Sequence, residues 1–143
     1  KTRALVEATR RSLEIGIEAA QPGARIGDIG AAIEDFILSC PEGYELVKEY
    51  TGHGIGRRLH EPPQIPNYGP AGRGPVLKPG MTLAIEPMVN LGQRHVEVLE
   101  DDWTVVARDG LPSAHYEHTI LVTDGEPEIL TCPENLPSEP RES

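Results

Sequence analysis

Residues 51–63 constrain the fold of this chain more than any other stretch of its sequence. They read TGHGIGRRLHEPP, so glycines flank one histidine, and a second histidine precedes a glutamate and two prolines. Glycine lacks a Cβ, which lets the backbone bend sharply or lets another segment approach closely. Proline can continue neither a helix nor an interior strand. The stretch is therefore predicted to be a rigid loop that presents His53 and His60.

These two histidines have an ordinary interpretation as well as a functional one. A single histidine in a loop is more often a surface or hydrogen-bonded residue than a ligand. The pairing of His53 and His60 with glycines and prolines favours the functional interpretation. Two glutamates further along the chain, Glu86 and Glu117, favour it again.

Charge, hydropathy and cysteine content exclude several classes of protein. The formal net charge is −10, whereas a nucleic-acid-binding face needs clustered lysines and arginines, so no direct nucleic-acid binding is expected. No apolar run approaches the roughly 20 residues of a membrane span, and no secretory signal opens the chain, so no membrane association is expected. Cys40 and Cys132 form neither a disulfide framework nor a Cys-x-x-Cys metal site, which favours a reducing, cytoplasmic compartment.

The first forty residues carry the pattern of two helices. Residues 1–20 place apolar side chains among charged ones as an amphipathic helix does. The chain begins at Lys1, inside this pattern and without an initiator methionine, so we expect it to be part of a longer protein. A second helix is expected to start with Asp28 as its N-cap and to end near Cys40 and Pro41.

The following residues have the composition of strands and turns. β-Branched and apolar residues concentrate in short segments between turns rich in glycine and proline. The expected strands are residues 44–50, 81–89, a hairpin of 95–99 and 103–108, 113–123 and 128–131. Residues 61–79 are expected to form an ordered loop, and residues 132–143 a disordered tail. Two helices followed by an antiparallel sheet make residues 1–131 a single α+β domain.

The period of a strand places Glu86 and Glu117 in the middle of strands, where glutamate is uncommon. Either one alone is more simply a solvated residue on the outer face of a sheet. Together with His53 they form an oxygen-rich donor set from three separate elements, which suits Mn²⁺, Fe²⁺, Co²⁺ or Zn²⁺. Carboxylates can also bridge two cations, and a water held between two ions becomes a nucleophile near neutral pH. The combination indicates a metal site.

Three motifs, in this order along the chain, resemble those of a known enzyme family. They are GHGIG at 52–56 with HEPP at 60–63, PGM at 79–81 with IEPM at 85–88, and AHYEHT at 114–119. In these motifs the chain resembles methionine aminopeptidases of the type I class, over nearly its whole length. The YEHT sequence favours this family over its fold relatives, the prolidases and aminopeptidases P. The short interval between His53 and Glu86 leaves no room for the large insertion of the type II class.

The resemblance implies a role for each matching residue. His53, Glu86 and Glu117 are implied to be metal ligands, with Glu117 bridging two divalent ions. Glu86 is also implied to accept a proton from the bridging water. His60 is implied to contact the substrate near its scissile amide and to support the tetrahedral intermediate.

The methionine pocket is less fully matched. Leu59 and Trp103 are implied to line this pocket, although Leu59 replaces a more usual aromatic residue. For Trp103, a place in the hydrophobic core is an equally good interpretation on grounds of burial. His115 stands where glutamine is commoner, and the resemblance implies no role for it.

The resemblance also implies that a large part of the enzyme is missing. The family's fold is a pseudo-symmetric pair of halves, called the pita-bread fold, with the active site between them. Two aspartate ligands and a third active-site histidine come from the N-terminal half. No aspartate of this chain stands in a strand context that matches that pair. Residues 1–131 are therefore expected to be the C-terminal half, while a missing N-terminal half supplies two further aspartate ligands.

The complete enzyme is expected to remove the initiator methionine from nascent proteins when the next residue is small. It would use two divalent metal ions (Co, Mn, Fe or Zn), and its expected partners are nascent polypeptide N-termini and the ribosome. The chain alone is expected to be inactive. Two alternatives stay open, a catalytically silent peptide-binding protein of the same fold and a related metallopeptidase such as a prolidase or aminopeptidase P. The retained ligands argue against the silent protein, because buried carboxylates without partners cost free energy.

Overall fold

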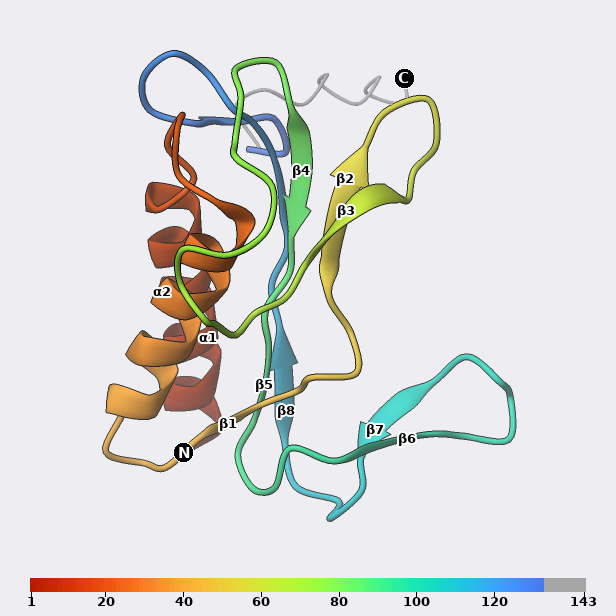
Figure 1. The fold of residues 1–143 in the computed structure, drawn as a ribbon. Helices are drawn as coiled ribbons and strands as arrows, with labels where there is room; N and C mark the ends of the chain where they lie inside the picture. The colour runs from red at the N-terminus through yellow and green to blue at the C-terminus, as the bar shows by residue number, and fades with distance from the viewer. Residues whose placement is uncertain (133–143) are drawn as a thin grey trace, which may run out of the picture.

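The computed structural model of this chain describes residues 1–132. Residues 133–143 lie outside the described part, and the predicted disorder of the 132–143 tail therefore stays a prediction. Within the described part, two helices come first and the strands follow, as an α+β domain requires. The two helices lie against one face of the strands (Figure 1). Neither of the described helices is long and apolar enough to cross a membrane.

Both predicted helices form. Helix α1 spans Thr2–Glu18 and helix α2 spans Ile26–Ser39, and Cys40 is the C-cap of α2 as expected. The buried residues of α1 recur every three or four positions, which is one face of a helix. Two of them are polar, and their hydroxyls donate to carbonyls of the preceding turn: Thr9 to Leu5 at 2.8 Å and Ser12 to Thr9 at 2.7 Å. Burial of these hydroxyls therefore leaves no donor unpaired.

The start of α2 differs from the prediction that Asp28 is its N-cap. Arg25 is the N-cap, and Asp28 is the third residue of the helix. The Asp28 carboxylate accepts hydrogen bonds from the backbone N–H of Arg25 at 2.7 Å and of Gly72 at 2.8 Å. The bond from Arg25, followed by that from Gly72, lowers the pKa of Asp28. The residue thus completes a capping box from inside the first turn and also fixes a distant loop.

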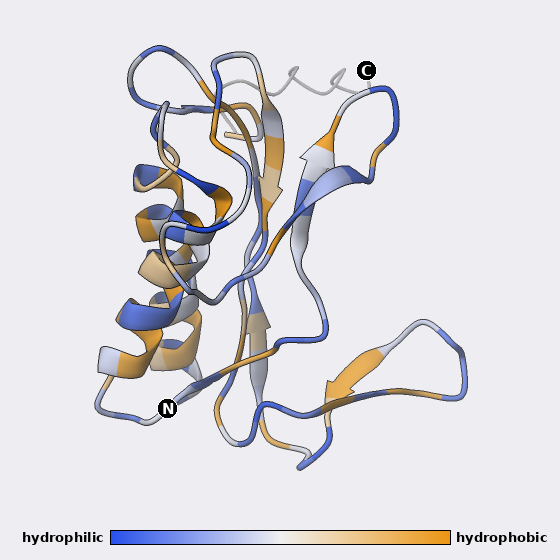
Figure 2. Ribbon diagram, in the orientation of Figure 1, coloured by the Kyte–Doolittle hydropathy of each residue, from blue (hydrophilic) through white to orange (hydrophobic). Residues whose placement is uncertain are grey.

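The hydrophobic core lies between the helices and the strands. Ile29, Ile33 and Ile37 lie on one face of α2 and are fully buried, while Phe36 is partly buried against the same core. Apolar residues run along both helices and along strand β4 (Thr82–Ile85), whereas the surrounding loops are mostly hydrophilic (Figure 2). The same core takes in Leu83, Ile85 and Ile120 from the strands, so the sheet that carries the candidate ligands is anchored directly on the helices.

The strands of the described residues form three sheets, in which every pairing is antiparallel. The three-stranded sheet has the order β1 (Glu45–Leu46), β5 (Met88–Asn90), β8 (Ser113–His115). The five-stranded sheet has the order β10 (Glu128–Ile129), β9 (His118–Leu121), β4, β2 (Gly52–Ile55), β3 (Glu61–Ile65). The two-stranded sheet pairs β6 (Val96–Val98) with β7 (Val105–Ala107).

The two long strands predicted at 81–89 and 113–123 are each interrupted, and this corrects the prediction. The first divides into β4 and β5 around Glu86 and Pro87, and the second divides into β8 and β9 before His118. Proline has no N–H to donate to a ladder, so regular pairing opens at Pro87. Each predicted strand consequently contributes to two different sheets.

The prediction of a rigid loop at 51–63 is also wrong, because these residues belong largely to a hairpin. Strands β2 and β3 pair with a shift in register between His53 and Gly54. Pro62 and Pro63 lie in β3, which is an edge strand of its sheet. Gly54 pairs with Glu61 and His53 with Gln64, so the shift leaves both prolines outside the pairing and their missing N–H groups break no ladder bond. The expected loop at 61–79 accordingly begins only after Ile65.

The remaining strand predictions are confirmed in part. Of residues 44–50 only Glu45–Leu46 pair, as β1. The predicted hairpin at 95–108 forms as β6 and β7, and it projects away from the body of the molecule (Figure 1). Its turn is fixed by Asp101, whose carboxylate accepts from the backbone N–H of Trp103 at 3.0 Å and of Thr104 at 2.8 Å.

Candidate metal centre

His53 lies in β2, between β4 and the edge strand β3, and the glycines beside it let both neighbouring strands approach closely. A Cβ on Gly52 would lie 2.2 Å from the Ala84 carbonyl oxygen of β4, and one on Gly54 would lie 2.4 Å from the Pro62 oxygen of β3. Real Cβ atoms do not come so close to backbone oxygens, so only glycine fits at both positions. Of the two alternatives that the glycines beside His53 left open, a sharp bend or a close approach, the structure shows the close approach.

The ring of His53 has a defined orientation. Its Nδ1 lies 3.0 Å from the Gly54 carbonyl oxygen, and because a carbonyl can only accept, Nδ1 carries the proton. The other ring nitrogen, Nε2, then keeps its lone pair, which is the form a metal ligand needs. His53 is also buried, so the imidazole is held in one tautomer away from bulk water.

Glu86 and Glu117 lie in the two strand interruptions, and the ladder register brings these interruptions together. Ile85 pairs with His118 on one side, and Met88 pairs with His115 on the other. The register is the same on both sides, so continuing it by one step from Ile85 sets Glu86 opposite Glu117.

The three predicted ligands converge. One nitrogen of His53 and one carboxylate oxygen each of Glu86 and Glu117 all lie within 4.8 Å of one another. One imidazole nitrogen and two carboxylate oxygens suit Mn²⁺, Fe²⁺, Co²⁺ or Zn²⁺, so the residues present fit a divalent ion. Glu117 is exposed, while Glu86 is half-buried, and this corrects the expectation that both carboxylates are buried.

The two carboxyl groups have pKa values that move in opposite directions. Burial disfavours the charge of Glu86, but contacts with His115 and Glu117 outweigh burial and lower its pKa from 4.5. Desolvation among its neighbours and the negative charge of Glu86 raise the pKa of Glu117 from 4.5. Two carboxylates so close repel each other when both are charged, so ionisation is disfavoured at Glu117 and favoured at Glu86. A cation in the cluster would relieve this repulsion.

His60 lies beside the cluster rather than within it. Its ring centroid is 4.1 Å from that of His53, and the ring planes are tilted by 41°. The residue is exposed and stands immediately before β3. His60 is therefore placed where a group bound at the cluster could reach its imidazole, while its catalytic role stays a prediction.

Two residues near Glu86 were not assigned by sequence reasoning. His115 places its Nε2 3.5 Å from Glu86 Oε2, and the fully buried Asn67 donates from Nδ2 to the Glu86 carbonyl oxygen at 3.3 Å. The position of His115, two residues before Glu117, was a usable signal, because such residues share one face of a strand. Asn67 follows β3 in a region expected to be loop, and its contact with Glu86 had no signal in the sequence.

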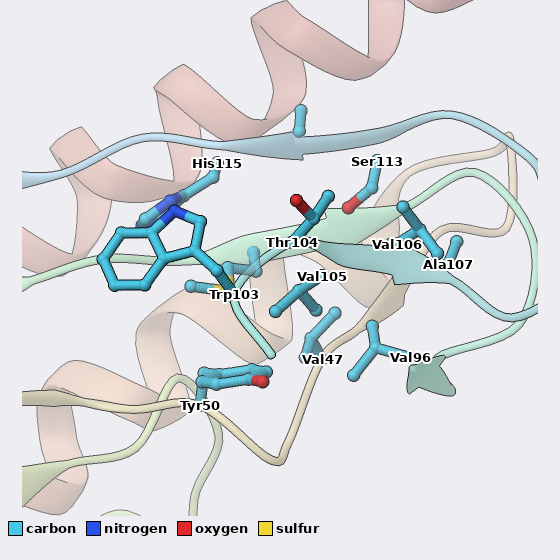
Figure 3. Close-up of a pocket in the computed structure, with 12 residues that line it drawn as sticks. Val47, Tyr50, Val96, Trp103, Thr104, Val105, Val106, Ala107, Ser113 and His115 are labelled. Carbon is cyan, nitrogen blue, oxygen red and sulfur yellow. The ribbon is translucent and has the colours of Figure 1, made fainter. Parts of the chain in front are cut away.

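A cavity of about 650 Å³ opens beside these residues, between the β6–β7 hairpin and the body (Figure 3). Trp103, Tyr50, Met88 and His115 are among its lining residues. Trp103 is 86% exposed, so the interpretation of this residue as a core tryptophan is wrong. Leu59 is 68% exposed and lies in the turn between β2 and β3, and its predicted place in a methionine pocket stays a prediction.

Comparisons with known proteins agree with this geometry. The profile of metallopeptidase family M24 matches residues 1–124. Methionine aminopeptidase 1 of Bacillus subtilis (strain 168) is 53% identical over 127 residues, which are 89% of this chain and 50% of that protein. Methionine aminopeptidase of Escherichia coli (strain K12) is 48% identical over 127 residues, 89% of this chain and 47% of that protein. The chain thus spans about half the length of the curated relatives it matches.

Solved structures give the same result for the fold. The crystal structure of methionine aminopeptidase from Thermotoga maritima superposes with a TM-score of 0.86 at 52% identity, and the match covers 90% of this chain and 51% of that one. The prolidase from Pyrococcus horikoshii superposes with a TM-score of 0.64 at 23% identity, covering 91% of this chain and 31% of that one, which shows a shared fold only. The predicted half of a pita-bread fold and the resemblance to methionine aminopeptidases are confirmed.

Proposed function

The chain belongs to metallopeptidase family M24, and from this membership we propose that it is part of a methionine aminopeptidase, an enzyme that removes the N-terminal methionine from polypeptides. The observation that carries the proposal is the convergence of His53, Glu86 and Glu117 within 4.8 Å. Two relatives named methionine aminopeptidase, which are 53% and 48% identical to this chain in sequence, support the same activity. The substrate class we propose is the N-terminus of a nascent polypeptide whose second residue is small.

The proposed cofactor is a pair of divalent ions from the series Co, Mn, Fe and Zn. His53, Glu86 and Glu117 would hold them from this chain. Three donors are too few for two ions, so we propose that two aspartates from the part of the relatives outside the match complete the set. A bound divalent ion supplies Lewis-acid activation of a carbonyl oxygen and of water.

The chain's own residues perform the proton transfers and the positioning. Glu86, whose pKa is lowered, is ionised near neutral pH and accepts the proton of the attacking water. A bound cation would favour the ionised carboxylate of Glu117 and so oppose the effect that raises the pKa of this group. His60 donates a hydrogen bond to the scissile carbonyl oxygen as negative charge develops there.

The cavity beside the cluster is proposed to hold the methionine side chain. Trp103 and Tyr50 are aromatic residues of its lining, and sulfur next to an aromatic ring is a favourable contact. The indole comes from the β6–β7 hairpin and Tyr50 from the segment before β2, so the two rings approach the cavity from different elements (Figure 3). The amide to be cleaved would then lie toward His115 and the carboxylates, since His115 lines the same cavity.

A chimera tests the proposal directly. The matched half of the Bacillus subtilis enzyme is replaced by residues 1–132 of this chain, and release of methionine from a Met-Ala-Ser peptide is followed with Co²⁺ or Mn²⁺ present. We expect turnover that is lost in Glu117→Ala and kept in the control Glu128→Ala, whose residue lies in β10 outside the cluster. A folded, metal-loaded chimera that binds the peptide without cleaving it would instead support the catalytically silent peptide-binding protein. Cleavage of Xaa-Pro but not of Met-Ala peptides would support a prolidase-like activity.

A further inference from the structure

The carboxylate of Glu86 lies between two imidazoles, one on each of its oxygens. Oε1 is 3.9 Å from His53 Nε2, and Oε2 is 3.5 Å from His115 Nε2. Glu86 is the more sheltered partner, since its side chain is 14% exposed against 42% for His115. The two oxygens of this group therefore have different surroundings, although they are chemically equivalent.

The register of the strands explains this arrangement. His53 is paired with Ala84 across β2 and β4, and His115 is paired with Met88 across β8 and β5. Both pairing partners are two residues away from Glu86, one before it and one after it. Diagonal neighbours at this spacing are within reach of long side chains. The two histidines thus approach one carboxylate from opposite ends of the strand interruption.

We propose that His115 is a positioning residue, which holds Oε2 of Glu86 and thereby keeps Oε1 directed toward His53 for the metal ion. The inference rests on the proposed metal centre and goes beyond it, because no role of His115 follows from the ligand set. His115 is not itself in the group of donors that lie within 4.8 Å of one another. Its imidazole acts on the ion only through the carboxylate.

A glutamate needs such a partner because its carboxylate turns easily. The terminal torsion of the side chain is broad and has no staggered wells, so nothing within Glu86 itself fixes the plane of its carboxylate. The two oxygens are rigidly linked, and a partner that holds one of them also orients the other. The backbone of the residue is already fixed, because Asn67 donates to its carbonyl oxygen. His115, whose Nε2 is 3.5 Å from Oε2, supplies the missing restraint on the side chain.

The test measures metal affinity in the purified chain rather than activity. Binding of Co²⁺ to the metal-free protein is followed by calorimetry and by the visible absorption of the ion, for wild type, His115→Leu, His115→Gln and His95→Leu. Removal of a residue that orients a metal ligand without touching the metal weakens metal binding by about 10–100-fold. We expect a decrease in Co²⁺ affinity of this size in His115→Leu. His115→Gln keeps an N–H donor and should recover most of the affinity. His95 lies outside the cluster, so His95→Leu controls for the loss of any histidine.

A second measurement separates positioning from direct ligation. With Cu²⁺ as the probe, pulsed electron paramagnetic resonance counts the imidazoles bound to the ion. We expect one imidazole in wild type and one in His115→Leu. Two in wild type and one in the variant would make His115 a ligand and overturn the proposal, as would equal Co²⁺ affinity in wild type and His115→Leu. Thermal unfolding by circular dichroism checks that each variant is folded.

The proposal can also be tested separately from the metal centre. If the wild-type chain bound no Co²⁺ at all, the proposed ligand set would fail, and crystal structures of metal-free wild type and His115→Leu would decide on His115. The proposal expects Glu86 Oε1 to face His53 in wild type and to turn away in the variant. An unchanged Glu86 carboxylate in both structures would overturn it.

Discussion

Glu86 and Glu117 stand opposite each other where the ladder is interrupted between β4–β9 and β5–β8. The interruption covers two residues on each strand, and the pairing is in the same register before and after it. Neither carboxylate is constrained by regular sheet hydrogen bonding there, yet both are held by the strands on either side. The paired strands on both sides of the interruption therefore hold two carboxyl groups close together, and a cation bound between them would reduce their repulsion.

Removal of one of these carboxylates should abolish tight metal binding. Glu117→Gln preserves the size of the side chain but takes away a charged donor from a group of three. Removal of a residue that only orients a metal ligand already weakens metal binding by about 10–100-fold. Removal of a ligand itself should weaken metal binding at least as much. Titration with Co²⁺ measures the change, and Glu128→Gln serves as the control. Unchanged affinity in Glu117→Gln would exclude this residue from the ligand set.

The pH dependence of stability should also report Glu117. Its pKa is raised above 4.5 in the folded chain, so this carboxyl group stabilises the fold below pH 4.5, and the contribution is lost as pH rises through the raised pKa. Glu86 behaves in the opposite way, because its pKa is lowered. Its contribution to folding stability is present above pH 4.5 and is lost as the pH falls through the lowered pKa.

The measurement is urea unfolding of metal-free wild type and Glu117→Gln, with a chelator present, at pH 4.5 and near neutral pH. From pH 4.5 to neutral pH, the free energy of unfolding of wild type should fall relative to that of Glu117→Gln. A relative gain over the same interval would show that the pKa of Glu117 is lowered instead. Glu128→Gln again controls for a change of charge outside the cluster.

The glycine before His53 should not tolerate a side chain. A Cβ on Gly52 would lie 2.2 Å from the Ala84 carbonyl oxygen, so Gly52→Ala must separate β2 from β4. We expect a loss of about 1–3 kcal/mol in the free energy of unfolding, as for other overpacked sites. Gly125→Ala is the matched control, because nothing lies within 4 Å of its added Cβ. Urea unfolding of both variants decides, and equal stability would mean that the strands can separate freely.

His60 should affect rate rather than metal content. In the active chimera, His60→Ala removes a positioned donor, and the catalytic rate should fall by ~10²-fold. The metal content of the variant should stay that of wild type, because His60 lies beside His53 and outside the donor group. Elemental analysis of the purified variant measures it. A variant that had lost its metal would show that the roles of the two histidines are exchanged.

The chain by itself should not cleave Met-peptides. Its described residues supply three donors, and the proposed enzyme needs residues outside the match to complete the site. Correct positioning contributes about 7–11 kcal/mol of barrier reduction in enzymes. Release of methionine from Met-Ala-Ser, with Co²⁺ or Mn²⁺ added, is measured against the full-length Bacillus subtilis enzyme. Turnover by the chain that disappears in Glu117→Ala would contradict this expectation.

The local features of this protein and its candidate ligands can be inferred from the order of its amino acids alone. Both helices follow from the spacing of their apolar residues, since that spacing depends only on the geometry of one helix. The glycines of residues 52–54 already indicated that another segment comes close to His53. The hairpin at 95–108 and the donor types of Glu86 and Glu117 were readable for the same reason, because each depends on residues that are neighbours in the chain.

The positions where the strands break, and the side chains that meet there, depend on how the strands pair in the folded protein. The period of a strand assigns residues to faces, but it does not reveal that pairing stops at Glu86 and Glu117, because the interruption depends on the partner strand as well. Proline at positions 62 and 63 was compatible with a loop and with an edge strand, and the sheet order selected the edge. The contacts of His115 and Asn67 with Glu86 join residues distant in sequence, and such contacts are fixed by ladder register rather than by local pattern.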